Sequence, residues 1–272
     1  MEIMAIEYEF KEAKQPEFPP RNLIGIKSGD ETFEVSADAF GTNSYKGNIE
    51  EMSKKYSHPQ TGETISFRPA TTRKSILTAS YKFPERAKPQ IFNPRWLQAG
   101  RIVRTSEGVF ANVPLDENGN PIFDEKILTS YLNGVEPKTV GKGKVYLVPN
   151  NRTLEDFGFA DYKSFTRDIQ DCGDFVNGGL AKVLEHNERA EALEEISSAK
   201  NYPRGVNVWG FDSVSKPTLK VASLDSGRGS GGGLYVDGGW GGVDDDGGGF
   251  AFGVRNASDP QSRSPQKIKK FY

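Results

Sequence analysis

Residues 225–254 read DSGRGSGGGLYVDGGWGGVDDDGGGFAFGV, and the interpretation of the whole chain depends on this stretch. Between residues 225 and 249, 12 Gly, 5 Asp and 2 Ser make up 19 of 25 positions. Ordinary proteins contain about 7% glycine. Such a composition is typical of a flexible linker, because glycine has no side chain to bury and loses the most backbone entropy on ordering.

Apolar residues interrupt this segment with the two-residue spacing of β-strands. Leu234 and Val236 flank Tyr235, and the run Phe250–Val254 alternates in the same way. One side of each run can therefore enter a core while the other side faces solvent. One strand and a short basic tail follow, which is not the setting of a linker between domains. We expect residues 219–256 to form ordered strands and surface loops; a disordered linker is the alternative.

The chain before this segment predicts an α+β fold, with about two helices packed on an antiparallel sheet. Up to about residue 75, short apolar runs lie between Gly, Pro and Asp, which indicates strands and loops. The runs 101–104 and 109–113 alternate like paired strands. Residues 124–132 predict a short helix, because Asp124 can cap its start and Asn133-Gly134 can end it.

Residues 162–199 carry apolar side chains at roughly helical spacing, beginning with Phe165 and Ile169. We expect helices here, with a break or a close helix contact at Gly178-Gly179. The runs 206–211 and 219–224 then predict strands that lead into the glycine-rich segment.

The overall composition is that of a globular protein without a basic excess. Lys and Arg number 35 and Asp and Glu 37, a net charge of −2, which argues against general binding to nucleic acid or anionic membranes. No signal peptide and no run of about 18 apolar residues is present. Cys172 is the single cysteine, which excludes an internal disulfide. We expect a cytoplasmic or virion protein that inserts into no membrane.

The possible cofactor and metal motifs lack the surrounding sequence that such sites require. Gly227, Gly229 and Gly232 match the spacing of a dinucleotide fingerprint, but a strand follows where that fingerprint requires a helix. Asp244-Asp245-Asp246-Gly247 is acidic enough for calcium, yet adjacent carboxylates do not reproduce the spaced ligands of an EF-hand. We expect no cofactor, and calcium remains an alternative to a solvated acidic loop.

Catalytic residues are also not indicated. The two histidines are His58, in a loop before proline, and His186, in an acidic helical stretch, and both are expected at the surface. Acidic neighbours of Cys172 oppose formation of a thiolate. Carboxylate pairs stay open, since 37 Asp and Glu offer many candidates. We expect a binding protein rather than an enzyme.

The glycine-rich segment resembles the variable region of the proteins diversified by diversity-generating retroelements. The codons of Gly, Asp and Ser (GGY, GAY and AGY) arise from AAY by changing adenines alone, as in that family, where adenines of a template are randomised. Arg204–Phe211, ending in Trp-Gly-Phe, and the closing Gly253-Val254-Arg255 resemble motifs of its C-type lectin fold, shared with the formylglycine-generating-enzyme superfamily. Two features depart from that pattern: Val254 replaces Phe, and the preceding Arg-Gly-Gly-Ser-Trp motif is absent.

The resemblance covers about residues 200–257 and implies a C-type-lectin-like ligand-binding domain, which we place at residues 81–272, with a variable region at about 222–256. It implies nothing for residues 1–80, which we interpret as an N-terminal accessory segment. The ligand of that domain would be a protein or another macromolecule. The glycines would be display positions without a side chain. The buried scaffold would be Leu234, Val236, Trp240, Val243, Phe250 and Phe252. The ligand-binding positions would be Asp225, Ser226, Arg228, Ser230, Tyr235, Asp237, Trp240, Asp244, Asp245 and Asp246. Trp240 is also interpretable as a core residue.

Two other functions remain open on the sequence. A structural or virion assembly protein would carry the glycine-rich region as a passive surface loop. A calcium-dependent lectin or hydrolase would use its carboxylates. Residues 225–249 contain five Asp against one Arg, a net charge of −4, so a binding surface built from them favours basic or hydrogen-bond-donating ligands.

Overall fold

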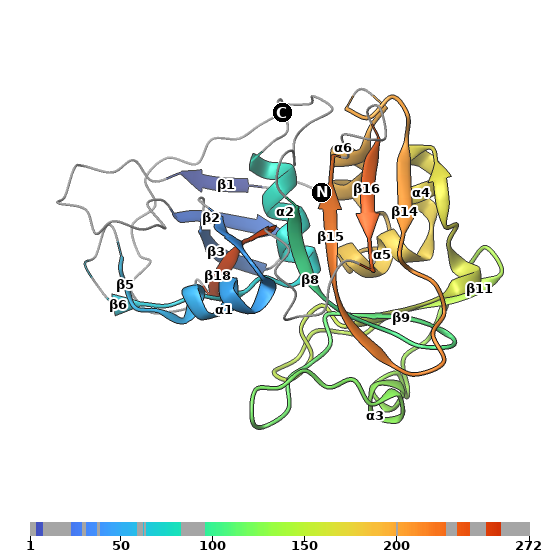
Figure 1. Cartoon of the computed structure of the whole chain (residues 1–272), viewed down its shortest axis with the longest axis horizontal. Helices are drawn as coiled ribbons and strands as arrows, with labels where there is room; N and C mark the ends of the chain where they lie inside the picture. The colour runs from blue at the N-terminus through green and yellow to red at the C-terminus, as the bar shows by residue number, and fades with distance from the viewer. Residues whose placement is uncertain are drawn as a thin grey trace.

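A computed structural model shows a mixed α+β protein built mostly from antiparallel sheets (Figure 1). It describes residues 4–7, 23–28, 31–36, 39–58, 62, 64–82, 96–199, 201–226, 233–239 and 249–256. This agrees with the expected α+β class. No helix in these ranges is long and apolar enough to span a membrane.

The larger sheet contains the strands that precede and include the glycine-rich segment. Its main path runs in the order β10 (Lys138–Val140), β11 (Gly143–Leu147), β12 (Gly158–Asp161), β9 (Gly108–Ala111), β8 (Leu97–Arg104), β15 (Thr218–Asp225), β16 (Leu234–Asp237), β14 (Val206–Trp209) and β13 (Asp168–Gln170). Along this path only β14 and β16 pair in parallel. The predicted strand pair at 101–104 and 109–113 is confirmed as β8 and β9.

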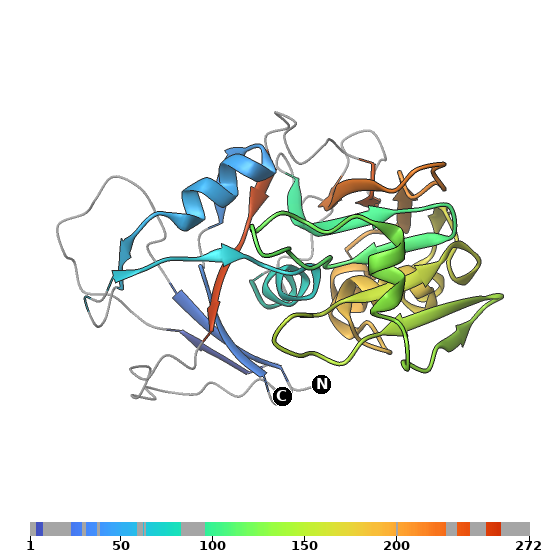
Figure 2. The ribbon, with the colours of Figure 1, turned by 90° about the horizontal axis from the view of Figure 1, so that it is seen from below.

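Three short helices cover one side of this sheet: α4 (Cys172–Asn177), α5 (Gly179–Glu185) and α6 (Glu191–Ser197). Figure 1 looks onto β14, β15 and β16 with the helices behind them, and Figure 2 shows the helices beneath the strands. Apolar side chains of these strands and helices form one core cluster. The predicted break at Gly178-Gly179 is confirmed, since α4 ends and α5 begins there.

The predicted helical region starts later than its apolar spacing indicates. The 3₁₀ turn η1 (Tyr162–Ser164) and strand β13 occupy its first third, so Ile169 lies on a strand rather than in a helical stripe. Two local features explain the late start. Asp168 has a φ of 90°, which no helix accommodates, and the Asp171 carboxylate caps α4 at the backbone N–H of Asp174, 2.8 Å away.

The smaller sheet combines N-terminal strands with the last described strand of the chain. Its order is β1 (Met4–Glu7), β2 (Leu23–Ser28), β3 (Glu31–Ser36), β18 (Gly253–Asn256) and β7 (Arg68–Pro69). Strand β17 (Gly249–Ala251) pairs with β4 (Phe40–Asn43) and, at one residue, with β8, and a separate hairpin joins β5 (Tyr56–Ser57) and β6 (Thr64–Ile65). The run predicted as one strand at 250–254 is therefore two strands of different sheets.

This pairing changes the expected domain division at residue 80. Side chains of β2 and β3 share a core cluster with those of α5, α6 and β16. Because β18 completes the N-terminal sheet, residues 1–80 and 81–272 do not form separate cores. The C-type-lectin topology stays a proposal.

Two helices fall where only strands and loops were expected: α1 (Tyr45–Ser53) and α2 (Thr72–Lys82). Helix α2 packs against α5, α6 and β8, and its buried residues include Lys74, Ser75 and Thr78. A helix that is buried on nearly every side shows no amphipathic stripe. The spacing of its apolar residues therefore did not predict a helix. Helix α3 (Glu125–Ser130) is confirmed, with Asp124 as its cap.

Candidate ligand-binding face

Strand β16 fixes the middle of the glycine-rich segment inside the larger sheet. It pairs with β15 on one side and β14 on the other. Leu234 and Val236 are fully buried, as are Phe252 and Val254 further along. The expected scaffold is thus confirmed at these positions, and the linker interpretation is wrong for residues 233–239 and 249–256.

The strand register places a set of side chains together on the side of the sheet opposite the helices. Directly paired residues share a side, as do residues two apart along a strand. Tyr235 points away from the core, because its neighbours Leu234 and Val236 point into it. The residues paired with Tyr235 across four strands form one row, and the residues two positions further along β14 and β16, with their partners, form a second row beside it. This outer face consists of Ile169, Asn207, Tyr235 and Asp225 in the first row and Trp209, Asp237, Ser223 and Gln98 in the second.

The outer face changes in character across the sheet. On β13 and β14, Ile169 is 69% exposed and Trp209 is 62% exposed. Tyr235 and Asp225 are half-buried in the middle. On β8, Gln98 is covered, because its side chain hydrogen-bonds to Asn48 of α1. The open part of the outer face is therefore its β13–β16 side.

Sequence reasoning missed Trp209 and Ile169 as surface residues. Trp209 was interpreted as part of the Trp-Gly-Phe motif, and Ile169 as part of a helical core stripe. The period-two pattern of Val206–Trp209 does place Trp209 opposite the buried Val206 and Val208, so this residue had a local signal. Ile169 had none, because its exposure follows from pairing with β14.

Two of the expected display residues are buried, which corrects that expectation. The Asp237 carboxylate accepts the backbone N–H of Gly239 at 2.6 Å and closes the turn after β16, and only 5% of the residue is exposed. Ser226 is 2% exposed and its hydroxyl lies 2.7 Å from the phenol oxygen of Tyr202. Both side chains are bound into the scaffold.

Some glycines of the segment are required by packing and are not display positions with a deleted side chain. A Cβ at Gly238 would lie 2.5–2.7 Å from the ring of Phe211, and one at Gly249 would lie 2.7 Å from the Gln98 side chain. Gly210, with a φ of +70°, lies against Gly239. The Trp-Gly-Phe motif therefore anchors the turn that follows β16.

The remaining predicted binding residues lie outside the described residues: Arg228, Ser230, Trp240, Asp244, Asp245 and Asp246. These residues belong to the segments 227–232 and 240–248. The described residues on either side of the first segment lie beside one row of the outer face, and those on either side of the second lie beside the other row. Ser226 and Gly233 border 227–232 beside the row of Tyr235. Gly239 and Gly249 border 240–248 beside the row of Asp237 and Gln98.

Burial affects the titration of groups at this end of β15. It raises the pKa of Asp225, although the Ser226 backbone N–H opposes this shift. It also raises the pKa of Tyr202 to about 12, against a hydrogen bond to Ser226 that lowers it. Within the described ranges, no three His, Cys, Asp or Glu side chains group as metal ligands.

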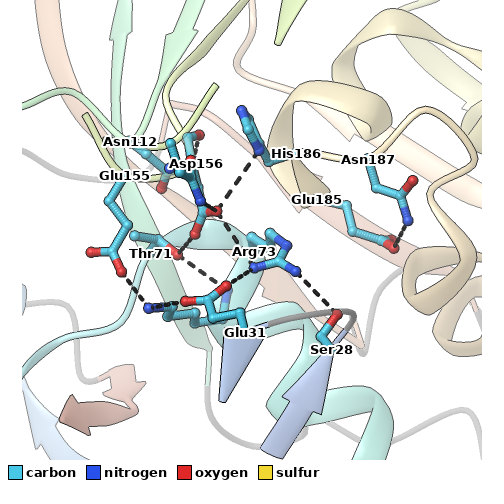
Figure 3. Close-up of polar contacts among 12 residues, drawn as sticks. Ser28, Glu31, Thr71, Arg73, Asn112, Glu155, Asp156, Glu185, His186 and Asn187 are labelled. Carbon is cyan, nitrogen blue, oxygen red and sulfur yellow. Dashed lines mark hydrogen bonds and ion pairs between the residues drawn. The ribbon is translucent and has the colours of Figure 1, made fainter. Parts of the chain in front are cut away.

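A second polar cluster joins α2 to the N-terminal sheet (Figure 3). Arg73 forms ion pairs with Glu31 and, at 3.5 Å, with Asp156, and Lys74 pairs with Glu31 at 2.7 Å and with Glu155. Burial raises the pKa of Glu31, but the hydrogen bonds and charges of Lys74 and Arg73 outweigh it, so that pKa is lowered overall. We interpret this cluster as a structural contact between the two sheets.

His186 belongs to the same cluster and is not a surface residue as expected. Its side chain is 12% exposed, with Nε2 3.0 Å from the Val148 carbonyl and Nδ1 3.8 Å from the Asp156 carboxylate. Burial lowers the pKa of His186, and the charge of Asp156 opposes that shift. The Thr71 hydroxyl, 2.5 Å from Asp156, donates to the same carboxylate. These groups satisfy one another.

No family model matches the chain, and neither a curated protein nor a solved structure is significantly similar to it.

Proposed function

We propose that this chain is a receptor-type protein that binds a macromolecular ligand through the outer face and the glycine-rich segment at about 222–256. The resemblance to retroelement target proteins would explain how the composition of that segment arose. A surface that must tolerate sequence change needs a backbone held in place by other residues. The chain would act without catalysis, as a binding protein of the cytoplasm or of a virion.

The observation that carries the proposal is the division of roles within β16. Leu234 and Val236 enter the core, while Tyr235 between them faces outward beside Asp225. Composition alone favours a linker, yet this part of the segment is a central strand. The segments 227–232 and 240–248 therefore start and end on a fixed sheet.

The carboxylates of the segment favour a basic protein ligand. Residues 225–249 carry a net charge of −4, whereas the whole chain carries only −2, so the acidity is local. Association with such a ligand should slow as salt rises, because exposed charges are screened over about 8–10 Å at physiological ionic strength.

The most direct test is genomic. A retroelement target gene should have a near-identical copy of the DNA for residues 220–257 nearby, differing almost only at adenines, beside a reverse transcriptase gene. If the locus has neither, retroelement diversification is wrong, and an assembly protein with a passive loop becomes the better explanation.

Binding itself is tested by exchanging side chains. A ligand selected against the wild-type protein should lose affinity when the side chains of 225–249 are replaced by another Gly, Ser, Asn and Tyr set. The buried Ser226, Leu234, Val236 and Asp237 and the packed Gly238 and Gly249 stay unchanged, so that the scaffold folds. Affinity that survives the exchange would place the site elsewhere.

A further inference from the structure

Trp209 and Ile169 form an apolar patch on the outer face, outside the glycine-rich segment. They are the two most exposed large hydrophobic residues of the described chain, at 62% and 69%. Ile169 pairs directly with Asn207, and Trp209 lies two residues further along β14 on the same side. This diagonal relation is within the reach of aromatic and long side chains.

The backbone of Trp209 is fixed on both sides. Its carbonyl accepts the N–H of Gly238 at 2.9 Å, and Val208 before it is buried. After it, the Gly210 carbonyl accepts a hydrogen bond from Arg104, and Phe211 is fully buried. An exposed indole on a fixed strand loses little conformational entropy when a partner covers it.

The patch borders carboxylates. Asp225 is half-buried and lies two strands away from Trp209 in the neighbouring row, whereas Asp237, which pairs with Trp209, is buried and bound to the turn after β16. None of the eight outer-face residues is cationic. Two arginines lie at the border: Arg104 donates to the Gly210 carbonyl, and Arg167, two residues before Ile169, forms an ion pair with Asp212 at 3.1 Å. An indole face attracts Lys and Arg, and carboxylates nearby add to that attraction.

We propose that Trp209 and Ile169 are a constant anchor that binds an apolar side chain flanked by Lys or Arg on a protein partner. The inference rests on the proposed function, because it assigns part of the same interface to residues that the retroelement does not change. Trp209 would contribute affinity for many ligands, and the glycine-rich segment would select among them. Aromatic anchors surrounded by adaptable positions are common in interfaces.

The test uses 12-residue peptides selected from a displayed random library against the full chain. Selected peptides should be enriched in Lys or Arg next to aliphatic or aromatic residues. Their affinity should fall at least about tenfold for Trp209→Ala, less for Trp209→Phe, and measurably for Ile169→Ser. Phe123→Ala removes a side chain of similar exposure, 54%, beside α3, and should leave affinity unchanged.

The outcomes separate this inference from the proposed function. If peptides lose affinity for Trp209→Ala but tolerate the side-chain exchange within 225–249, the anchor stands and the proposed role of the segment fails. If they tolerate Trp209→Ala but not the exchange, the anchor is wrong and the proposed function stands. Acidic peptides, or equal losses for Phe123→Ala, overturn the anchor. Circular dichroism of each variant checks that the sheet is intact.

Discussion

Single residues of the outer face have opposite roles although they come from the same acidic segment. Asp237 closes a turn from a buried position, whereas Asp225 is half-buried at the end of β15. Composition does not distinguish these two aspartates, since both are acidic residues among glycines and serines. Their burial differs because the turn at Gly210 packs against the Asp237 carboxylate and Gly239.

Substitution should reveal this difference as unequal costs in stability. Asp237→Ala leaves the Gly239 N–H without its acceptor and should lower the free energy of unfolding by about 1–3 kcal/mol. Asp225→Ala should change it by no more than about 0.5 kcal/mol, as for ordinary surface sites. Urea unfolding of the two variants measures both values. Equal costs would contradict the distinction between scaffold and display.

At the scale of elements, β16 should behave as a central strand. Its backbone is paired with β14 and β15, so the amides of 234–237 should exchange with solvent slowly, on the scale of the sheet rather than of a loop. Hydrogen exchange followed by mass spectrometry measures this. Exchange at the rate of an unstructured peptide would restore the linker interpretation.

Helix α6 provides a pH-dependent test. The buried Glu185 carboxylate accepts the N–H groups of Ala192 and Leu193 at 3.0 and 2.8 Å, in place of a side-chain cap at Ala190. Burial raises the pKa of Glu185 above 4.5, which outweighs these hydrogen bonds. The folded state then holds the proton more tightly than the unfolded state, so stability should fall as pH rises from about 4.5 through the raised pKa.

Glu185→Gln should remove this pH dependence, because the amide does not ionise. Its single oxygen replaces only one of the two acceptors that bind the N–H groups of Ala192 and Leu193, which adds a loss of stability that does not vary with pH. The free energies of unfolding of wild type and variant, measured from pH 4 to pH 8, should diverge in favour of the variant as pH rises. A constant difference across that range would show that ionisation of Glu185 is not coupled to folding.

At the scale of the whole molecule, the Arg73 and Lys74 cluster couples the two sheets. The pKa of Glu31 is lowered overall, and so is that of Glu155, where burial is outweighed by Arg68 and Lys74. Carboxyls with lowered pKa stabilise the fold above their unfolded pKa and lose that contribution as pH falls through the folded value. Acid should therefore weaken the contact between the sheets.

Glu31→Gln tests this coupling. The variant should be less stable than wild type at pH 7, and the difference should shrink as pH falls below about 4.5, where the wild-type carboxyl also becomes neutral. Denaturant unfolding at pH 7, 5 and 3 measures the trend. Glu117→Gln, which changes an exposed residue of the loop before α3, is the control and should show no such trend.

The sequence by itself determined the elements whose pattern is local. Alternation at 206–209 and 234–236 specified strands because one face of each is buried, and Asp124 specified the start of α3 through its own side chain. The α+β class follows from these elements. The proposal of a binding segment also came from sequence, because the residue types of the segment carry it.

Only the tertiary structure decided what each side chain contacts. The run 250–254 divides between two sheets, and α2 is buried on nearly every side, because partners distant in sequence surround them. Asp237 is buried because the turn at Gly210 and Gly239 packs against it, while Ile169 is exposed because its pairing with β14 places it on the outer face. Residue spacing reports which side of an element is apolar, whereas exposure depends on what the rest of the chain places against that side.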